Sequence, residues 1–461
     1  MLTSVQATRA RTVPGSTDHF FADLRRREFS RLDRNGEAYL DYTGSALYAE
    51  RQIRAYSNVL RRGVFGNPHS ENKPSRASTE IIDKAREQLL EFLDAPPEEY
   101  VVCFTANTSA AIKLVAESFP FDSESALLLS TDNHNSVNGI REFAGRAGAK
   151  VEYLPLDPDL RLADPLSYLE KHAFVRNKMF AYPAQSNFSG VKHGFALARY
   201  ARALGYAVLV DAAAFAPTNP ISLRATPVDF LALSMYKVFG FPTGVGALVA
   251  RRDSLRRLRR PWFAGGTVEY ASVQNQSHLL RERESGFEDG TPAFLDIAAL
   301  SEGFELLRDV TMDRLNARVT MLTSELLDRL QSLRRADGLP LVRIYGPTNI
   351  DARGGTVAFN VLDRDGHAVP YPVVERAARD AGVAVRGGCF CNPGASESAF
   401  EFPANLARKC AENVTSAGFT VEKFSECIGR DIAVGAVRAS VGMATNVEDL
   451  ERLVGVVQSS N

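Results

Sequence analysis

The middle of the chain alternates short apolar runs with segments of helical periodicity. The runs that we predict as strands are Val101–Phe104, Ala126–Ser130, Val151–Leu156, Lys178–Ala184, Tyr206–Ala214, Phe230–Ser234 and Gly244–Ala250. Helical segments between some of them are Ala110–Ser118, Ser136–Ala147 and Phe195–Leu204. Continuous apolar runs are typical of strands buried on both faces, and alternation with helices favours a mostly parallel sheet flanked by helices. The pattern therefore predicts an α/β domain.

The flanks of this region have a different pattern. Helical spacing continues in Ile81–Leu93 and Asp313–Leu333. Beyond residue 333, predicted strands (Val342–Tyr345, Thr356–Leu362, Val383–Arg386 and Ala436–Val441) mix with predicted helices (Tyr371–Ala381 and Asn446–Val457). This mixture predicts a smaller C-terminal α+β domain. We divide the chain into an N-terminal extension (1–30), a large domain (31–330) whose first segment also contributes to the small domain, and a small domain (331–461) with a weakly periodic insertion at about 395–430.

The composition is close to that of an average soluble globular protein and gives no support to some classes of function. The 461 residues include 54 Lys+Arg and 55 Asp+Glu, and this balance gives no reason to expect nucleic-acid or membrane binding. No apolar run reaches the ~18 residues of a membrane span, and the basic N-terminus lacks a signal-peptide core, so we expect a cytoplasmic protein. Five cysteines are few and odd in number, which makes disulfides improbable and favours a reducing compartment.

Two charged residues stand at the ends of predicted strands. Asp211 ends an apolar run and is followed by three alanines, among them Ala213, which leave room for a flat ligand. Lys237 follows the strand Phe230–Ser234 and precedes a Gly/Pro-rich turn. Alone, the lysine would more often reach the surface, and the aspartate could be a helix cap. Together, at the carboxyl edge of one sheet, they could form a ligand site with a lysine nucleophile.

Two further segments reach the same edge. In FTANTSAAIK, Thr108 and Ser109 stand where a helix follows a strand, a position suited to a phosphate. No P-loop or dinucleotide fingerprint is present. His134 follows another strand and could stack on an aromatic ligand or move protons, although a loop histidine is more common. A lysine, a carboxylate, a phosphate site and a histidine are the groups that a pyridoxal phosphate enzyme needs.

The sequence resembles the class V aminotransferases of the fold-type I pyridoxal phosphate enzymes over nearly its whole length. Within that family it is most similar to cysteine desulfurases and to the N-terminal domain of molybdenum cofactor sulfurases. The segments that carry the resemblance are YLDYTGSA, FGNPHS, FTANTSAAIKLVAE, DNHNSVNGIR, YPAQSNFSG, LVDAAAF, SMYKVFGFPTGVGAL, FAGGTV, FEDGTPAF, RGGCFCNPGA and VRASVG.

The resemblance implies roles for individual residues. Lys237 would hold pyridoxal phosphate covalently, Asp211 would pair with its ring nitrogen, and His134 would stack on the ring. The residues expected around the phosphate and ring are Thr108, Ser109, Ala213, Ser234, Tyr236, Asn187 and Thr267, the last of these reaching across a homodimer interface. Arg438 would bind the substrate carboxylate, for which a guanidinium fork is suited, and Asn187 and Arg386 would lie near the substrate.

The loop RGGCFCNP contains two cysteines. The resemblance places Cys391 where desulfurases have a cysteine that takes sulfur from the substrate, with Cys389 two positions earlier. Arg386 nearby would favour the thiolate. The alternative is a pair of inert cysteines, and C-x-C without a partner pair is not zinc spacing, so no metal is expected.

Three departures bear on the reaction. Sulfurases usually have a third cysteine after this loop, where Ser396 stands, and desulfurases often have a glutamine where Ala214 stands. We also expect no room after residue 461 for a sulfurase C-terminal domain. Our main hypothesis is a desulfurase that converts L-cysteine to L-alanine and passes sulfur to an acceptor protein. The alternatives are a lyase, aminotransferase or epimerase acting on another amino acid, and a non-catalytic scaffold.

Overall fold

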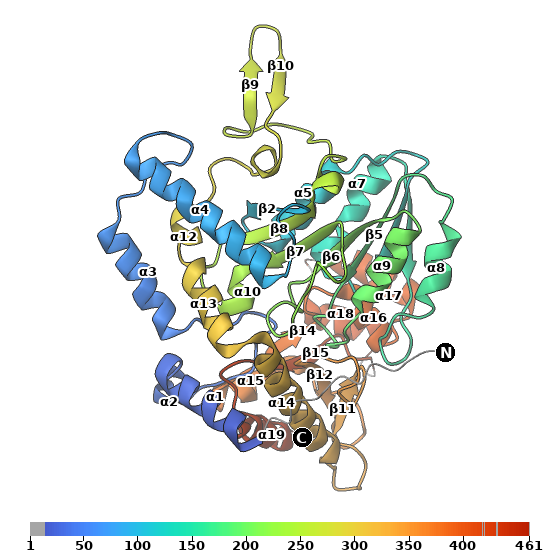
Figure 1. Ribbon diagram of the computed structural model, residues 1–461. Coiled ribbons are helices and arrows are strands. Elements are labelled where there is room, and N and C mark those ends of the chain that lie inside the picture. Colours follow the sequence, from blue (N-terminus) through green and yellow to red (C-terminus); the bar gives the residue numbers. More distant parts are fainter. Residues whose placement is uncertain (1–13, 417, 419, 430–431, 461) are drawn as a thin grey trace, which may run out of the picture.

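A computed structural model describes residues 14–416, 418, 420–429 and 432–460 (Figure 1). The basic stretch at residues 1–13, which is the first part of the predicted extension 1–30, lies outside the described residues. Among the described residues, no helix is both long and apolar enough to cross a bilayer.

The core of the large domain is a seven-stranded sheet with the strand order β2-β8-β7-β6-β5-β3-β4. Strand β8 runs antiparallel to both of its neighbours, and the other strands are parallel to one another. The strands are β2 (Tyr100–Thr105), β3 (Ala126–Ser130), β4 (Lys150–Leu154), β5 (Lys178–Pro183), β6 (Ala207–Asp211), β7 (Phe230–Ser234) and β8 (Gly246–Arg251). The predicted mixed, mostly parallel sheet is confirmed.

Helices cover both faces of this sheet because its strands are apolar on both sides. Along β2, Val101 and Cys103 face one core, and Tyr100 and Val102 face the other. The first core is covered by α5 (Thr108–Ser118), α6 (Asn135–Asn138) and α7 (Ile140–Arg146); the second is covered by α4 (Lys73–Phe92), α9 (Phe195–Ala203), α10 (Met235–Phe239), α12 (Phe294–Ile297) and α13 (Leu300–Val310) (Figure 1). The remaining helices of this region are α3 (Glu50–Arg62), α8 (Pro165–Lys171), α11 (Arg252–Leu255) and the 3-10 turn Glu284–Gly286.

The smaller part of the molecule contains an antiparallel sheet in the order β11-β12-β15-β14. Its strands are β11 (Val342–Tyr345), β12 (Thr356–Val361), β14 (Arg386–Gly388) and β15 (Ala436–Ser440), packed with α14 (Met312–Ser332), α15 (Tyr371–Asp380) and α19 (Val447–Ser459). The N-terminal part of the chain joins it. Strand β1 (Ala38–Tyr39) pairs in parallel with β13 (Val383–Ala384).

From residue 14 on, where the described part of the chain begins, two helices precede β1, namely α1 (Pro14–Glu28) and α2 (Arg31–Asn35). Phe21 and Leu24 of α1 are buried, and Arg25 donates to Asp449 of α19 at 2.6 Å. The last part of the predicted extension is therefore docked against the C-terminal helix. A two-stranded hairpin, β9 (Val268–Ser272) and β10 (Ser277–Leu280), projects from the opposite end of the molecule (Figure 1).

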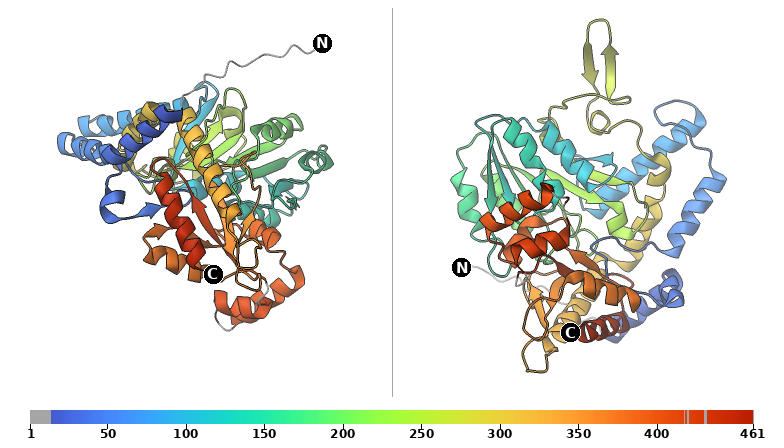
Figure 2. Two further views of the ribbon diagram at one scale, coloured as in Figure 1. Left: turned by 90° about the horizontal axis from the view of Figure 1, so that it is seen from below. Right: turned by 180° about the vertical axis from the view of Figure 1, so that it is seen from behind.

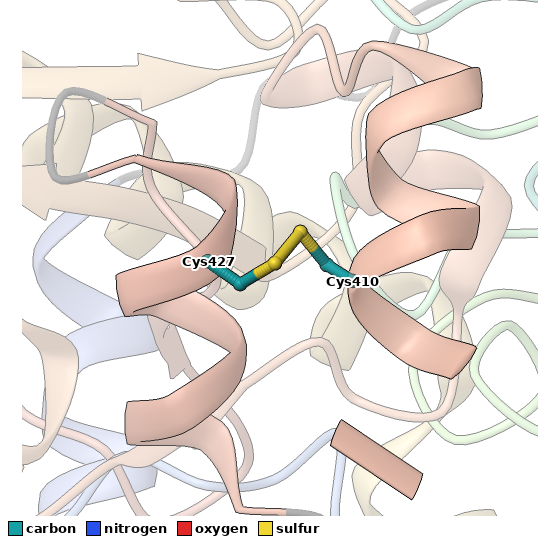
Figure 3. Close-up of a disulfide and its surroundings, with 2 residues drawn as sticks. All are labelled: Cys410 and Cys427. Atoms are coloured by element: carbon teal, nitrogen blue, oxygen red, sulfur yellow. A yellow bond between two sulfur atoms is a disulfide. The ribbon is translucent and has the colours of Figure 1, made fainter. Parts of the chain in front are cut away.

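The weakly periodic insertion consists of three helices, α16 (Pro393–Ala399), α17 (Ala404–Ser416) and α18 (Val421–Ile428), which are at the front in the right-hand view of Figure 2. A disulfide joins Cys410 of α17 to Cys427 of α18 (Figure 3). The expectation that the cysteines form no disulfide was therefore wrong, because two of the five face each other across this helical pair. Cys103, Cys389 and Cys391 are free.

We predict that this disulfide stabilises the insertion locally. Replacing Cys410 with serine should raise the exchange rate of backbone amides in α17 and α18, because a cross-link over a loop of this size contributes about 3 kcal/mol. Hydrogen exchange read by mass spectrometry checks this, with Cys391→Ser as the control that removes a free thiol only. Equal exchange in α17 and α18 with and without the disulfide would contradict the prediction.

Candidate active site

The carboxyl ends of β3, β5, β6 and β7 meet at one edge of the large sheet, and a cavity of about 330 Å³ opens there. Lys237, Asp211 and His134 all line it. Also in the lining are other residues expected at the site, namely Thr108, Ser109, Asn187, Ala213, Ser234 and Tyr236. The fold thus brings predicted site residues as far apart in the sequence as Thr108 and Lys237 (237 − 108 = 129 positions) into one cavity.

Lys237 lies on the short helix α10, directly after β7. Gly240 ends this helix with φ +83°, and a Cβ there would come within 2.3 Å of the backbone of Leu47. Only glycine fits this close approach, which keeps the turn after Lys237 short. Within the described residues, the Lys237 amine makes no hydrogen bond or ion pair. Burial lowers its pKa below the usual value of lysine, with Asp211 opposing this effect, so the amine is a better nucleophile at neutral pH.

Asp211 is the last residue of β6 and is buried. Its Oδ1 accepts the N–H of Ala213 at 2.9 Å, which fixes the carboxylate at the strand end. Ala213 and Ala214, which follow it, also line the cavity and have no side-chain bulk there. The aspartate is thus held by the backbone while it faces a space suited to a flat group.

His134 stands between β3 and α6, where its Nδ1 accepts the backbone N–H of Ser136 at 3.1 Å. Burial lowers its pKa below the usual value of histidine, Lys237 and Arg438 lower it further, and Asp211 opposes them. With Nδ1 accepting, the neutral ring carries its proton on Nε2. The ring is therefore a neutral group beside the lysine and the aspartate.

We predict that His134 titrates below pH 6.5, the ordinary value for histidine, in protein freed of its cofactor. The charged ring loses hydration on burial and meets two cationic neighbours, so it stays neutral as the pH falls through that value. Carbon-13 NMR of labelled histidine checks this, and the His134→Gln variant identifies the signal by its loss. A midpoint above 6.5 would contradict the argument.

The start of α5 provides donors for an anion. Asn107 caps the helix and accepts the N–H of Ala110 at 3.0 Å. The Thr108 and Ser234 hydroxyls lie 2.6 Å apart, and those of Ser109 and Ser136 lie 2.5 Å apart. Among the described residues, the backbone N–H of Ser109 has no protein acceptor. Together these groups form a polar rim that suits a phosphate.

Sequence reasoning missed several residues of the cavity, which are Asn107, Ser136, Gln185, Thr243 and Gly244. All five lie in motifs quoted above, but nothing in their spacing set them apart from their neighbours. Gln185 is buried, and its side-chain amide lies 3.4 Å from both Thr356 and Asn219. It stands between the large domain and β12.

The two expected arginines lie beside the cavity and are not part of its lining. Arg438 of β15 is buried, donates to the backbone oxygen of Asn187 at 3.1 Å and packs on the ring of Phe390 at 4.7 Å. Both arginines also bind Asp41, a residue that sequence reasoning did not single out. Arg438 donates to its Oδ1 at 2.9 Å and Arg386 to its Oδ2 at 2.6 Å.

The cysteine loop is hydrogen-bonded to residues at and next to the cavity. The Cys391 carbonyl accepts the N–H of Asn135, next to His134, at 2.8 Å, and the Phe390 carbonyl accepts from the Asn187 side chain at 2.7 Å. Cys391 is exposed, whereas the Cys389 thiol donates to the Val434 carbonyl at 3.3 Å. Burial raises the pKa of Cys389 above its usual value. Neither cysteine lines the cavity in this conformation.

Thr267 lies at the base of the β9–β10 hairpin and outside the cavity of its own chain. It is buried, and its hydroxyl accepts the N–H of Ala264 at 2.9 Å. A single chain therefore does not bring Thr267 to the other site residues.

A model of the family Aminotransferase class-V matches residues 38–453. The chain belongs to this family. It is therefore a pyridoxal-phosphate-dependent enzyme with a fold-type I architecture. The match begins at β1 and ends in α19, so the class-V region includes the small domain and the cysteine loop.

Individual relatives and solved structures show which members of the family the chain is similar to. The chain is similar to molybdenum cofactor sulfurases of Arabidopsis thaliana (35% identity over 95% of this chain) and Homo sapiens (33% over 95%), and it covers 58% and 50% of their lengths. It thus spans about half of the length of these relatives. An apo cysteine desulfurase from Thermococcus onnurineus NA1 superimposes with a TM-score of 0.76, at 26% identity, over 95% of this chain and 97% of that one. The Escherichia coli cysteine desulfurase CsdA shares the fold, with a TM-score of 0.74 at 21% identity over 95% of this chain and 98% of that one.

The residues of the cavity fit the class-V cofactor. Lys237 offers an unpartnered amine, and within the described residues the Asp211 Oδ2 makes no hydrogen bond and can face a ring nitrogen. The start of α5 offers an N–H and hydroxyl donors for a phosphate. The apolar side chains of Ala213 and Ala214 leave space for a ring.

Proposed function

We propose that this enzyme mobilises sulfur from L-cysteine. In the proposed reaction the C–S bond of L-cysteine breaks, the sulfur atom bonds to the Cys391 thiol, and the products are L-alanine and a Cys391 persulfide. Every atom is accounted for, because the hydrogen of the Cys391 thiol and that of the substrate thiol are shared between the persulfide and alanine. The attachment of the Cys391 backbone to the turn that holds His134 is the observation that most supports this reaction.

Bound pyridoxal phosphate would supply an electron sink for the substrate carbon that bears the amino group. In this proposal Lys237 holds the cofactor and then carries protons to and from the substrate. Asp211 keeps a positive charge on the ring nitrogen, and His134 covers the ring as a neutral group. Arg438 binds the α-carboxylate, for which its buried guanidinium is suited.

Cys391 is a better candidate for the sulfur carrier than Cys389. Its thiol is exposed, while the Cys389 thiol is bound to a carbonyl, and burial raises the pKa of Cys389. A thiolate is the attacking form, so the group with the raised pKa is the poorer nucleophile. Ser396 is buried and donates to the Asn392 carbonyl at 2.8 Å, so it lies away from the surface of the loop.

A second reaction is favoured by one observation. Cys391 does not line the cavity, so sulfur could leave as sulfide without a protein acceptor. L-cysteine and water would then give pyruvate, ammonia and sulfide by β-elimination. The class-V fold also accommodates aminotransferases and epimerases, which would use another amino acid and no persulfide.

The partners follow from the same proposal. The names of the curated relatives suggest molybdenum cofactor as the final destination of the sulfur, and this chain would perform the step that takes sulfur from cysteine. An acceptor protein would receive it from Cys391. We also propose a homodimer, in which Thr267 of each chain lies near the phosphate site of the other. A cytoplasmic location stays a prediction.

The test is a product balance. Purified protein with pyridoxal phosphate receives L-cysteine and a reductant, and alanine, pyruvate and sulfide are measured separately. Equal amounts of alanine and sulfide support the desulfurase. Pyruvate equal to sulfide identifies β-elimination. Absence of all three rejects cysteine as the substrate.

A further inference from the structure

Asp41 lies between two arginines at the edge of the cavity. It follows β1 and reaches the small domain through a bridge to Ser440 of β15. Its Oδ1 accepts from Arg438, and Arg386 donates to its Oδ2 through Nη2 at 2.6 Å and Nε at 3.1 Å. One carboxylate therefore binds two guanidinium groups.

The two guanidinium groups and the Asp41 carboxylate together carry one net positive charge. Arg438 is 2% exposed, and its Nε has no partner, so it retains a donor for another anion. Glu375 faces Arg386 from α15, but its carboxylate accepts the N–H of Gly387 and is bound to neither arginine. Tyr39, also beside them, donates to the Ser45 carbonyl and remains neutral. A ligand with one negative charge would leave the bonded group electrically balanced.

We propose that Asp41 determines which substrates the enzyme accepts, by reducing the charge of the arginine pair so that it matches amino acids with a single carboxylate and disfavours those with two. This inference rests on the proposed role of Arg438 in carboxylate binding. The second carboxylate of a dianionic substrate would meet Asp41, which is buried, in place of a free guanidinium, and two like charges close together repel.

The test compares the binding of propionate and succinate to the cofactor-loaded enzyme by titration calorimetry at pH 7.5. The wild type is expected to bind propionate at least as well as succinate. In Asp41→Asn the preference should move toward succinate by about tenfold, since one unit of charge changes at close range. An unchanged ratio of the two dissociation constants in Asp41→Asn overturns the inference.

A second variant keeps the inference testable if Asp41→Asn does not fold. The Arg386 side chain is half-exposed, so Arg386→Gln should fold, and removal of a positive charge should move the preference toward propionate. A shift toward succinate, or none, overturns the inference. Asp449→Asn is the matched control, because Asp449 is a buried aspartate bound to Arg25 and does not line the cavity. Its ratio should equal that of the wild type, and a change as large as that of Asp41→Asn overturns the inference.

A failure of the Asp41 inference can be distinguished from a failure of the proposed desulfurase reaction. Alanine production by the wild type with an unchanged ratio in Asp41→Asn rejects the role of Asp41 and keeps the desulfurase. Propionate binding that is unaffected by Arg438→Gln rejects the carboxylate role of Arg438 and, with it, this inference.

Discussion

Replacing Lys237 with alanine should abolish both the covalent attachment of pyridoxal phosphate and the reaction. Among the residues that the structure describes, no other lysine lines the cavity, and the Lys237 amine has no partner and a lowered pKa. Without it the cofactor loses its bond to the protein, and the substrate loses the group that moves its protons. We expect loss of the visible absorption band of the attached cofactor and at least a 100-fold fall in alanine formation.

Lys192→Ala is the matched control for this experiment. Burial also lowers the pKa of Lys192, and its amine lies 3.4 Å from Asn219, but it is absent from the lining of the cavity. It should retain both the absorption band and activity close to that of the wild type. An attached cofactor in Lys237→Ala would show that another amine holds it, and the role assigned to Lys237 would be wrong.

Replacing Cys391 with serine should stop sulfur transfer while cofactor binding persists. The Cys391 thiol is exposed on a loop bound to the His134 turn, and serine cannot accept sulfur. We expect alanine formation to fall about 100-fold or more, with the absorption band unchanged. The peptide that contains Cys391 should gain the mass of one sulfur atom in the wild type only, as read by mass spectrometry without reductant.

Cys389→Ser provides the comparison within the same loop. Because the Cys389 thiol is bound to the Val434 carbonyl and the pKa of this thiol is raised, its loss should reduce activity by no more than about threefold. A persulfide on Cys389, or full transfer by Cys391→Ser, would reverse the assignment. Pyruvate formation that is unaffected by either change would favour β-elimination.

The residues at the strand ends could be predicted from the sequence, because the signals that mark them are local. Asp211 and Lys237 each follow a continuous apolar run, and parallel strands place their carboxyl ends at one edge. The strands β3 and β7 have the predicted bounds, Ala126–Ser130 and Phe230–Ser234. The predicted helix Ser136–Ala147 is divided into α6 and α7 at Gly139, a residue that weakens helices.

Other parts of the site depend on contacts that local patterns do not show. Asp41 appears in YLDYTGSA as one polar residue among others, and its importance follows only from its pairing with two arginines on β14 and β15. The disulfide Cys410–Cys427 was missed for a similar reason. Five is an odd number of cysteines and argued against disulfides, but the packing of α17 on α18 brings two of the five together.

The pairing of β1 with β13 has a consequence for the order in which the protein forms during synthesis. Asp41 meets Arg386, which follows 345 positions later in the chain. At about 5–20 residues per second, the ribosome needs roughly 20–70 s to reach that partner. The strands of the large sheet end by Arg251, so this sheet can assemble during this time, whereas β1 can pair with β13 only after Ala384 has been made. The arginine pair thus acquires its aspartate only after Arg386 and Arg438 have been made, so the proposed carboxylate selection arises later than the large sheet.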